Sequence, residues 1–219
     1  MDCKRLTINF LGDSITFGCY ASKPELSYVS LVGSILNVEV RNYGINGTRI
    51  ARQRVPSIKP QYDLYFASRV ADMKNDADIL FVFGGTNDFG HGDAPIGKIE
   101  DNTPDTFYGG LNVLIKEILK YYNKEQIIFI LPLHRMGENN PYGNGEKEVK
   151  SLTLDGYVNI MKEVLTKNDI NILDIREEMG GGINNPYLYD GLHPNDKGHQ
   201  KIAELICEYL KEKKFMTNK

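Results

Sequence analysis

Two short motifs near opposite ends of the chain contain the residue types that serve as a nucleophile and as its base. The motif GDSI at residues 12–15 places Ser14 directly after an apolar run, and DGLH at residues 190–193 places Asp190 three positions before His193. A serine hydroxyl becomes an effective nucleophile when a neighbouring base takes its proton. Histidine serves as that base, and an aspartate bonded to it holds the ring in the required tautomer. These three residues are therefore candidates for acyl-transfer chemistry.

Two glycine-rich motifs between them offer hydrogen-bond donors for the negative oxygen that such an attack creates. They are NYGING at residues 42–47 and GGTND at residues 84–88. Glycine lets a backbone N–H approach a ligand closely, and an asparagine amide donates from its side chain. Read singly, each motif has an ordinary alternative, because a serine after a strand is also a helix N-cap and a Gly-Gly pair is also a turn. Asp-x-x-His also occurs by chance on solvated loops.

Short apolar runs alternate with helical patterns along the whole chain, which predicts a parallel sheet with helices on both faces. Continuous runs such as ILFVF and IIFIL are typical of buried parallel strands. Four of the runs are followed at once by GDS, YGING, GGTND or PLHR, so these polar segments are expected at the carboxyl edge of the sheet, where ligands bind in open α/β folds. The expected strands are residues 6–11, 38–42, 78–83, 127–131 and 171–174.

Apolar residues at helical spacing predict the elements that cover this sheet. Stripes lie in residues 107–122, 154–165 and 202–210, and weaker patterns lie in 24–36 and 63–75. Thr103-Pro104-Asp105 is typical of a helix start, with a cap, a proline at the first position and an acid in the first turn. No repeat or linker divides the sequence, so residues 1–219 are expected to form a single domain.

Composition narrows the class of protein. The chain has 219 residues, of which 41% are hydrophobic and 25% charged, and its formal net charge is −3. These values exclude a mainly disordered chain and give no strong field for nucleic acid or an anionic membrane. No segment resembles a signal peptide or a membrane span. Three widely spaced cysteines without a C-x-x-C motif indicate reduced thiols, so we expect a cytoplasmic protein. The sequence is compatible with a monomer and with a homo-oligomer.

Taken together and in order, the four motifs resemble the SGNH hydrolases, also called the GDSL esterase/lipase family. GDSI, NYGING, GGTND and DGLHP are similar to the first, second, third and fifth blocks of that family, and the resemblance covers residues 6–199. Ile15 stands where the family has leucine, a difference that leaves the chemistry untouched. The resemblance implies a three-layer α/β/α sandwich of flavodoxin-like order, with about five parallel strands.

The same resemblance implies roles for individual residues. Ser14 would be the nucleophile, His193 the general base and then acid, and Asp190 the residue that orients His193. The oxyanion hole would comprise the backbone N–H groups of Ser14 and Gly47 and the side-chain amide of Asn87. Gly47 is preferred to Gly44 because the family glycine closes the N-x-x-x-x-G stretch. This chemistry requires neither a metal nor a cofactor.

Two stretches without periodicity, residues 89–102 and 134–147, are expected to form the rim of the pocket. Arg135, directly after a strand, is suited to a hydroxyl or a carboxylate. Each rim residue is also of a kind that is often merely solvated. A basic run in residues 49–59 fits an anionic substrate or, by preference, a helix face exposed to water. The candidates for binding the non-acyl part of a substrate are His91, Tyr108, His134 and Arg135, with Asp93 and Tyr142 beside them.

These residues predict a serine esterase that acts on small esters through an acyl-enzyme intermediate. Nothing in the sequence resembles a long apolar lid, which favours short, acetyl-type acyl groups, and acetylated carbohydrates are the most specific version. A thioesterase or a lysophospholipase with the same site is the alternative. Two rival functions have less support. A metallophosphoesterase needs more metal ligands than the four histidines provide, and the sequence has no D-x-H motif. The other rival is a non-catalytic binding module on the same fold.

Overall fold

Five parallel strands form the sheet that the apolar runs predict. The computed structural model describes residues 5–145, 147–182 and 184–215. Within these residues the strand order is β2-β1-β3-β4-β5, and every neighbouring pair is parallel. This is the flavodoxin-like order, so the predicted fold class is confirmed. The strands are β1 (Thr7–Gly12), β2 (Glu39–Gly44), β3 (Ile79–Phe83), β4 (Ile127–Ile130) and β5 (Asn171–Leu173).

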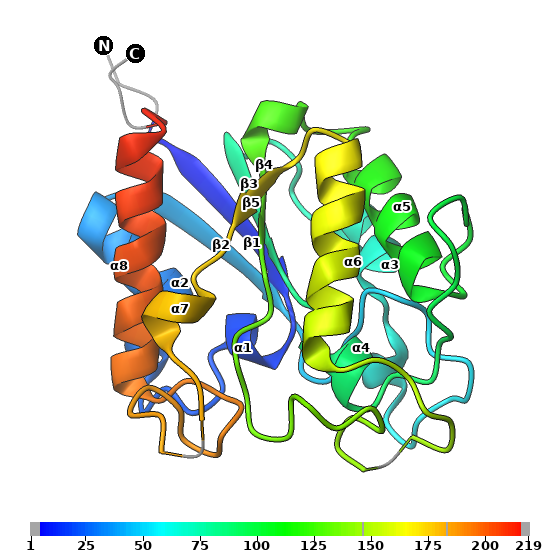
Figure 1. The fold of residues 1–219 in the computed structure, drawn as a ribbon. Helices are drawn as coiled ribbons and strands as arrows, with labels where there is room; N and C mark the ends of the chain where they lie inside the picture. Colours follow the sequence, from blue (N-terminus) through cyan, green and yellow to red (C-terminus); the bar gives the residue numbers. More distant parts are fainter. Residues whose placement is uncertain (1–4, 146, 183, 216–219) are drawn as a thin grey trace.

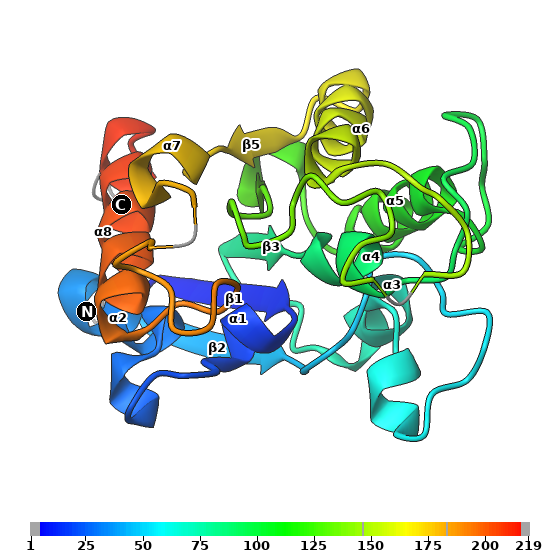
Figure 2. The same ribbon diagram turned by 60° about the horizontal axis from the view of Figure 1, so that its bottom comes forward.

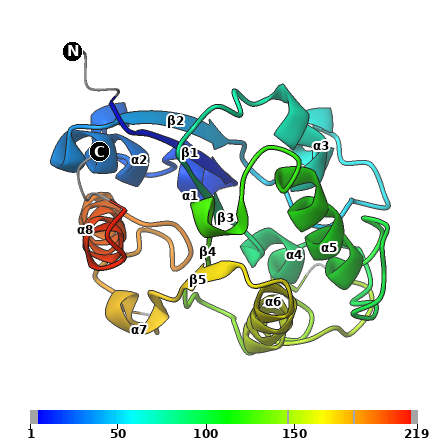
Figure 3. The same ribbon diagram turned by 90° about the horizontal axis from the view of Figure 1, so that it is seen from above.

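Helices cover both faces of the sheet and complete the three layers (Figures 1 and 3). One face carries α2 (Tyr28–Leu36), α7 (Arg176–Met179) and α8 (Asp196–Glu212). The opposite face carries α3 (Phe66–Arg69), α5 (Phe107–Ile118) and α6 (Leu154–Lys167). Two short helices, α1 (Ser14–Phe17) and α4 (Thr86–Gly90), follow strand ends. The 3-10 turns are η1 (Pro24–Leu26), η2 (Pro60–Asp63), η3 (Val70–Asp72) and η4 (Lys124–Gln126).

Alternation along each central strand divides the core into two parts. In β3, Ile79, Phe81 and Phe83 pack with the α2 and α8 side chains. Leu80 and Val82 instead pack with the side chains of α3, α5 and α6. Successive side chains of a strand point to opposite faces, so a strand buried on both sides must be apolar at every position. This is why ILFVF is a continuous apolar run.

Two local predictions are wrong in detail. The stripe at 63–75 is not one helix: it divides into the end of η2, then α3 and η3, and α3 begins at Phe66, whose N–H donates to the carbonyl of Arg49 at 2.9 Å. The cap of α5 is Thr106 rather than Thr103, because the Thr106 hydroxyl accepts from the N–H of Gly109. Both differences come from hydrogen bonds that periodicity does not encode.

The carboxyl ends of the strands lie at one edge of the sheet, which Figure 2 turns toward the viewer. α1 begins there after β1, α4 begins there after β3, and the segment before α8 passes beside α1. Segments that are far apart in sequence therefore meet at this edge. Among the described residues, no helix combines the length and apolar character needed to cross a membrane.

A buried carboxylate lies where β1 turns into α1. Asp13 is the N-cap of α1, and its Oδ1 accepts from the N–H of Ile15 at 3.0 Å. Its Oδ2 is buried without a hydrogen-bond partner among the described residues. Burial, supplemented by the charge of Asp88, raises the pKa of Asp13 to about 7, although Arg69 and Arg135 act in the opposite direction. A carboxyl with a raised pKa stabilises the fold at low pH, and this contribution is lost as the pH rises through the folded pKa.

We therefore expect Asp13→Asn to increase the free energy of unfolding at pH 8 and to have less effect at pH 5. Asparagine keeps the Oδ1 acceptor of the cap but carries no charge to bury. The measurement is urea unfolding of both proteins at several pH values between these limits. Asp72→Asn, at an exposed position in η3, is the matched control. A difference between wild type and Asp13→Asn that is constant across this range would contradict the assignment.

Candidate active site

Ser14, His193 and Asp190 form a continuous line of hydrogen bonds. The Oγ of Ser14 lies 2.9 Å from Nε2 of His193, although the two residues are 179 positions apart. The Nδ1 of His193 lies 2.8 Å from Oδ2 of Asp190. A carboxylate only accepts, so Nδ1 carries the proton and the Nε2 lone pair faces the serine hydroxyl. In this tautomer the histidine is set to take a proton from Ser14.

Backbone contacts hold Asp190 in place below the imidazole. Its Oδ1 accepts from the N–H groups of Leu192 and His193 at 3.0 and 2.8 Å. Partial burial acts to raise the pKa of Asp190, but the hydrogen bonds from His193 and Leu192 outweigh it, and the pKa lies below its usual value. Gly191 has a φ of 81°, in the left-handed region that permits this tight loop. The carboxyl is therefore ionised when the imidazole needs a counter-charge.

The second motif places the N–H of Gly47 differently from that of Gly44. The Gly44 N–H donates to Oδ1 of Asn42 at 2.8 Å and is occupied. No described residue accepts from the N–H of Gly47 or of Ser14. Gly47 has a φ of 72°, and a Cβ there would meet the ring of Tyr62 at 3.3 Å. The backbone N–H groups of Ser14 and Gly47 are thus open to a ligand.

The side-chain amide of Asn87, in α4, has a defined orientation. Its Nδ2 donates to the carbonyl of Thr48 at 3.0 Å. Its Oδ1 lies 3.2 Å from Nε2 of His91. The amide nitrogen has two hydrogens, and the contact with Thr48 uses one of them. One N–H of Asn87 is left for a ligand.

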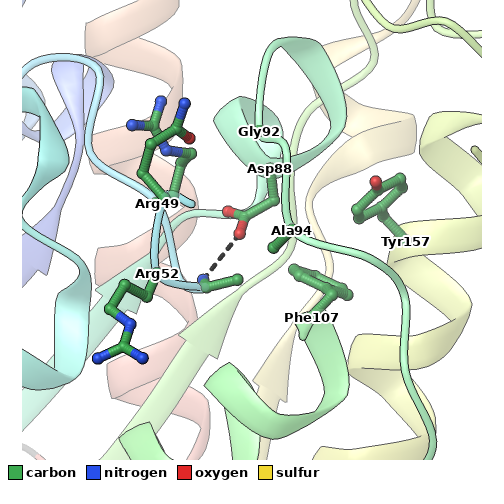
Figure 4. A pocket seen from close by; sticks show the side chains of 9 residues that line it. Arg49, Arg52, Asp88, Gly92, Ala94, Phe107 and Tyr157 are labelled. Carbon is green, nitrogen blue, oxygen red and sulfur yellow. Dashed lines mark hydrogen bonds between the residues drawn. The ribbon is translucent and has the colours of Figure 1, made fainter. Parts of the chain in front are cut away.

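Asp88 attaches the loop after Gly47 to the end of β3. Its two carboxylate oxygens accept from the N–H groups of Ile50 and Ala51 at 2.9 and 2.8 Å. Figure 4 shows this carboxylate directed at the backbone between Arg49 and Arg52, with a dashed line at one bond. Burial raises the pKa of Asp88 to about 6, against the lowering effect of these backbone bonds. The carboxylate holds the third motif to the loop that follows the second motif.

Arg69 joins the ends of β1 and β2 to the same loop. It is buried at 6% exposure and donates to the carbonyls of Gly12 and Tyr43 at 3.0 and 2.8 Å. It also donates to Oγ1 of Thr48 at 3.1 Å. Burial lowers its pKa to about 10, so the guanidinium remains charged at neutral pH. Arg69 therefore holds the backbone just before Ser14 to the end of β2 and to the loop that contains Thr48.

Four residues expected to recognise substrate lie in contacts of other kinds. His91 lies beside Asn87, and its Nδ1 accepts from Nη1 of Arg49 at 2.8 Å. Arg135 is buried and donates to Thr86 and Asn144. His134 contacts Glu138 and Arg176. The hydroxyl of Tyr108 donates to Glu163 of α6 at 2.6 Å.

The basic run at 49–59 was expected as an exposed helix face, and this expectation is wrong. Residues 49–59 are irregular, with neither helix nor strand. Arg49 is 4% exposed, and Arg52 forms an ion pair with Asp105. The loop crosses the carboxyl edge, where buried carboxylates need cationic and N–H partners, and it takes its shape from those contacts.

Two tyrosines that motif reasoning missed form an aromatic wall beside His193. The rings of Tyr20 and Tyr189 are stacked with centroids 4.4 Å apart, and the Tyr20 ring lies 5.2 Å from that of His193. Their exposed fractions are 47% and 68%. Tyr20 has a φ of 63°, a strained conformation for a residue with a Cβ. Tyr189 directly precedes Asp190, and that adjacency is the sequence signal that would have found it.

Across residues 5–145, 147–182 and 184–215, no group of three or more His, Cys, Asp or Glu side chains is arranged to hold a metal ion. Cys19 and Cys207 are free thiols, and Cys3 lies outside the described residues.

Comparisons with known proteins identify a family and solved structures with the same fold. The sequence profile of the GDSL-like lipase/acylhydrolase family matches residues 10–201. No curated protein matches the chain. A crystal structure of a Lactobacillus plantarum protein is 26% identical, with a TM-score of 0.76 over 96% of this chain and 98% of that chain.

Two further solved structures share the fold. A possible lipase from Chitinophaga pinensis is 23% identical, with a TM-score of 0.64 over 94% of this chain and 98% of that chain. The native aryl esterase of M. smegmatis is 15% identical, with a TM-score of 0.69 over 94% of this chain and 99% of that chain. Because the family match spans most of its length, the chain belongs to the GDSL-like lipase/acylhydrolase family.

Proposed function

We propose that the chain is a serine esterase that cleaves short-chain, acetyl-type esters of small alcohols, with carbohydrate esters as the preferred class. The observation that carries this proposal is the line of hydrogen bonds from Ser14 Oγ to His193 Nε2 and from His193 Nδ1 to Asp190. This arrangement takes a proton from a serine as it attacks a carbonyl carbon. Membership of an acylhydrolase family supports the reaction class.

The reaction proceeds in two acyl transfers. Ser14 Oγ forms a bond to the carbonyl carbon while its proton passes to Nε2 of His193, and the carbonyl electrons move onto oxygen. The tetrahedral intermediate then expels the alcohol, which takes the proton from His193. Water attacks the acyl-enzyme with His193 again acting as base, and the acid leaves. Asp190 stabilises the imidazolium in both halves.

The oxyanion is proposed to bind the N–H groups of Ser14 and Gly47 and the remaining amide N–H of Asn87. The first two have no acceptor among the described residues, and Asn87 has one hydrogen left after donating to Thr48. Donors placed before the reaction stabilise the developing charge without reorganisation. Gly47 is preferred to Gly44 because the Gly44 N–H already donates to Oδ1 of Asn42 at 2.8 Å.

Two features support a small acyl group and a leaving group with an apolar face. The described residues that directly follow β1 and β3 at the carboxyl edge form the short helices α1 and α4, and those that directly follow β2 form an irregular loop; these elements are too short to cover a fatty chain. Tyr20 and Tyr189 present exposed aromatic rings next to His193. An aromatic ring has an apolar face that packs against the C–H face of a sugar.

Hydrolysis of p-nitrophenyl acetate, butyrate and octanoate tests the reaction and the acyl preference. We expect turnover that falls with chain length, that a chelator leaves unchanged, and that Ser14→Ala reduces by a factor of about 10⁴ or more. Ser34→Ala, at an exposed serine of α2, is the matched control and should retain wild-type activity. Full activity in a pure Ser14→Ala protein, or inactivation by the chelator, would overturn the mechanism.

The substrate class requires separate assays. Acetate release from acetylated xylose and its oligomers is compared with hydrolysis of an acyl thioester and of a lysophospholipid at equal enzyme concentration. We expect the acetylated sugars to give the highest kcat/KM. A higher value for the thioester or the lysophospholipid would retain the serine mechanism and replace the proposed leaving group.

Asn87→Ala tests the oxyanion assignment. We expect kcat to fall about 100- to 1000-fold with little change in KM, because the donor is used mainly after the carbonyl oxygen becomes negative. Kinetics with p-nitrophenyl acetate give both constants, and urea unfolding measures how far the lost bond to Thr48 weakens the fold. A rise in KM with constant kcat would show that Asn87 binds ground-state substrate instead.

A further inference from the structure

A row of three side chains leads from the loop after β2 to the amide of Asn87. The Nη1 of Arg49 lies 2.8 Å from Nδ1 of His91, and the Nε2 of His91 lies 3.2 Å from Oδ1 of Asn87. The Arg49 side chain is 4% exposed and also donates to the carbonyl of Tyr62 at 3.1 Å. None of these contacts is required to hold Ser14, His193 or Asp190.

The guanidinium determines which nitrogen of His91 carries the proton. Arginine only donates hydrogen bonds, so Nδ1 of His91 must accept from Arg49. A neutral ring with a bare Nδ1 has its hydrogen on Nε2. That N–H points at Oδ1 of Asn87, which is an acceptor. Burial, together with the charges of Arg49, Arg135 and Lys147, lowers the pKa of His91 to about 4, so the ring is neutral at physiological pH.

This tautomer leaves the Asn87 amide with one favourable orientation. As it stands, Oδ1 accepts from His91 and Nδ2 donates to Thr48. Rotation of the amide by 180° would place Oδ1 against the Thr48 carbonyl and Nδ2 against the Nε2–H of His91. Two acceptors would then meet on one side and two donors on the other, and both pairs are unfavourable in a buried site.

We propose that Arg49 and His91 are positioning residues that hold the Asn87 amide with its free N–H toward the reacting carbonyl. The inference rests on the proposed function of Asn87 as an oxyanion donor. Arg49 acts by selecting the Nε2–H tautomer, and His91 acts by donating to Oδ1. In this role neither residue contacts the substrate, so we expect their loss to change kcat rather than substrate binding.

Paired substitutions of His91 test the donor. In His91→Gln the side-chain amide can place an N–H near the position of Nε2, whereas His91→Met is apolar and of similar length. With p-nitrophenyl acetate we expect His91→Met to lower kcat by about tenfold or more, the equivalent of one lost buried hydrogen bond, with KM within about twofold of wild type. His91→Gln should retain most of kcat. Equal kcat values for the two variants would overturn the proposal.

A double-mutant cycle separates positioning of Asn87 from a general structural role. If His91 acts only through Asn87, adding His91→Met to Asn87→Ala should lower kcat no further. Losses that multiply would contradict the proposal. If Asn87→Ala alone leaves kcat unchanged, the proposed oxyanion role has failed, and that result is distinct from a failure of His91.

The tautomer of His91 can be measured without an activity assay. Nitrogen-15 NMR of histidine-labelled wild-type protein should show a protonated Nε2 and a bare Nδ1 for His91. The His91 signals are assigned by their loss in His91→Gln. Should that variant fail to fold, they are assigned by eliminating the signals of the other three histidines. Arg49→Met should shift the ring toward the Nδ1–H tautomer, and Arg52→Met, at an exposed arginine of the same loop, should not. An Nδ1–H tautomer in wild type, or an Arg49→Met spectrum identical to wild type, would overturn the proposal.

Discussion

The buried guanidinium of Arg69 joins three backbone segments that the rest of the active edge depends on. It donates to backbone carbonyls at the ends of β1 and β2 and to the hydroxyl of Thr48 in the loop after β2. Ser14 follows the first of these contacts by two residues, and Gly47 precedes the last by one. The distance between Ser14 and the loop that contains Gly47 is thus restrained by one charged side chain, whose burial is offset by these hydrogen bonds and the nearby Asp13 charge.

The third strand is attached to the same loop by the side chains of Asn87 and Asp88. Asn87 donates to Thr48, and Asp88 accepts from Ile50 and Ala51. The open N–H donors therefore belong to segments that are held by polar contacts in addition to the apolar packing of Ile15, Ile50 and Phe89. Such contacts have direction, and this matters here because an oxyanion site is effective only when its donors are aimed before charge develops.

Local sequence patterns predicted the strands of this fold, but they failed where a contact between distant residues determines the local structure. All five strands lie where apolar runs predicted them, since a parallel strand buried on both faces leaves that pattern in the sequence. The start of α3, the cap of α5 and the shape of the 49–59 loop were wrong. Each depends on a particular partner, namely the Arg49 carbonyl, the Thr106 hydroxyl and the Asp88 carboxylate.

The sequence by itself determined the fold class, the family and the motifs of the carboxyl edge, because strand periodicity and motif order are properties of the chain read locally. Only the tertiary structure decided that His91 contacts Asn87, that Arg135 is buried, and that Tyr20 stacks on Tyr189 beside His193. A residue type states which bonds a side chain can make. Which of those bonds form depends on neighbours that packing brings from distant parts of the chain.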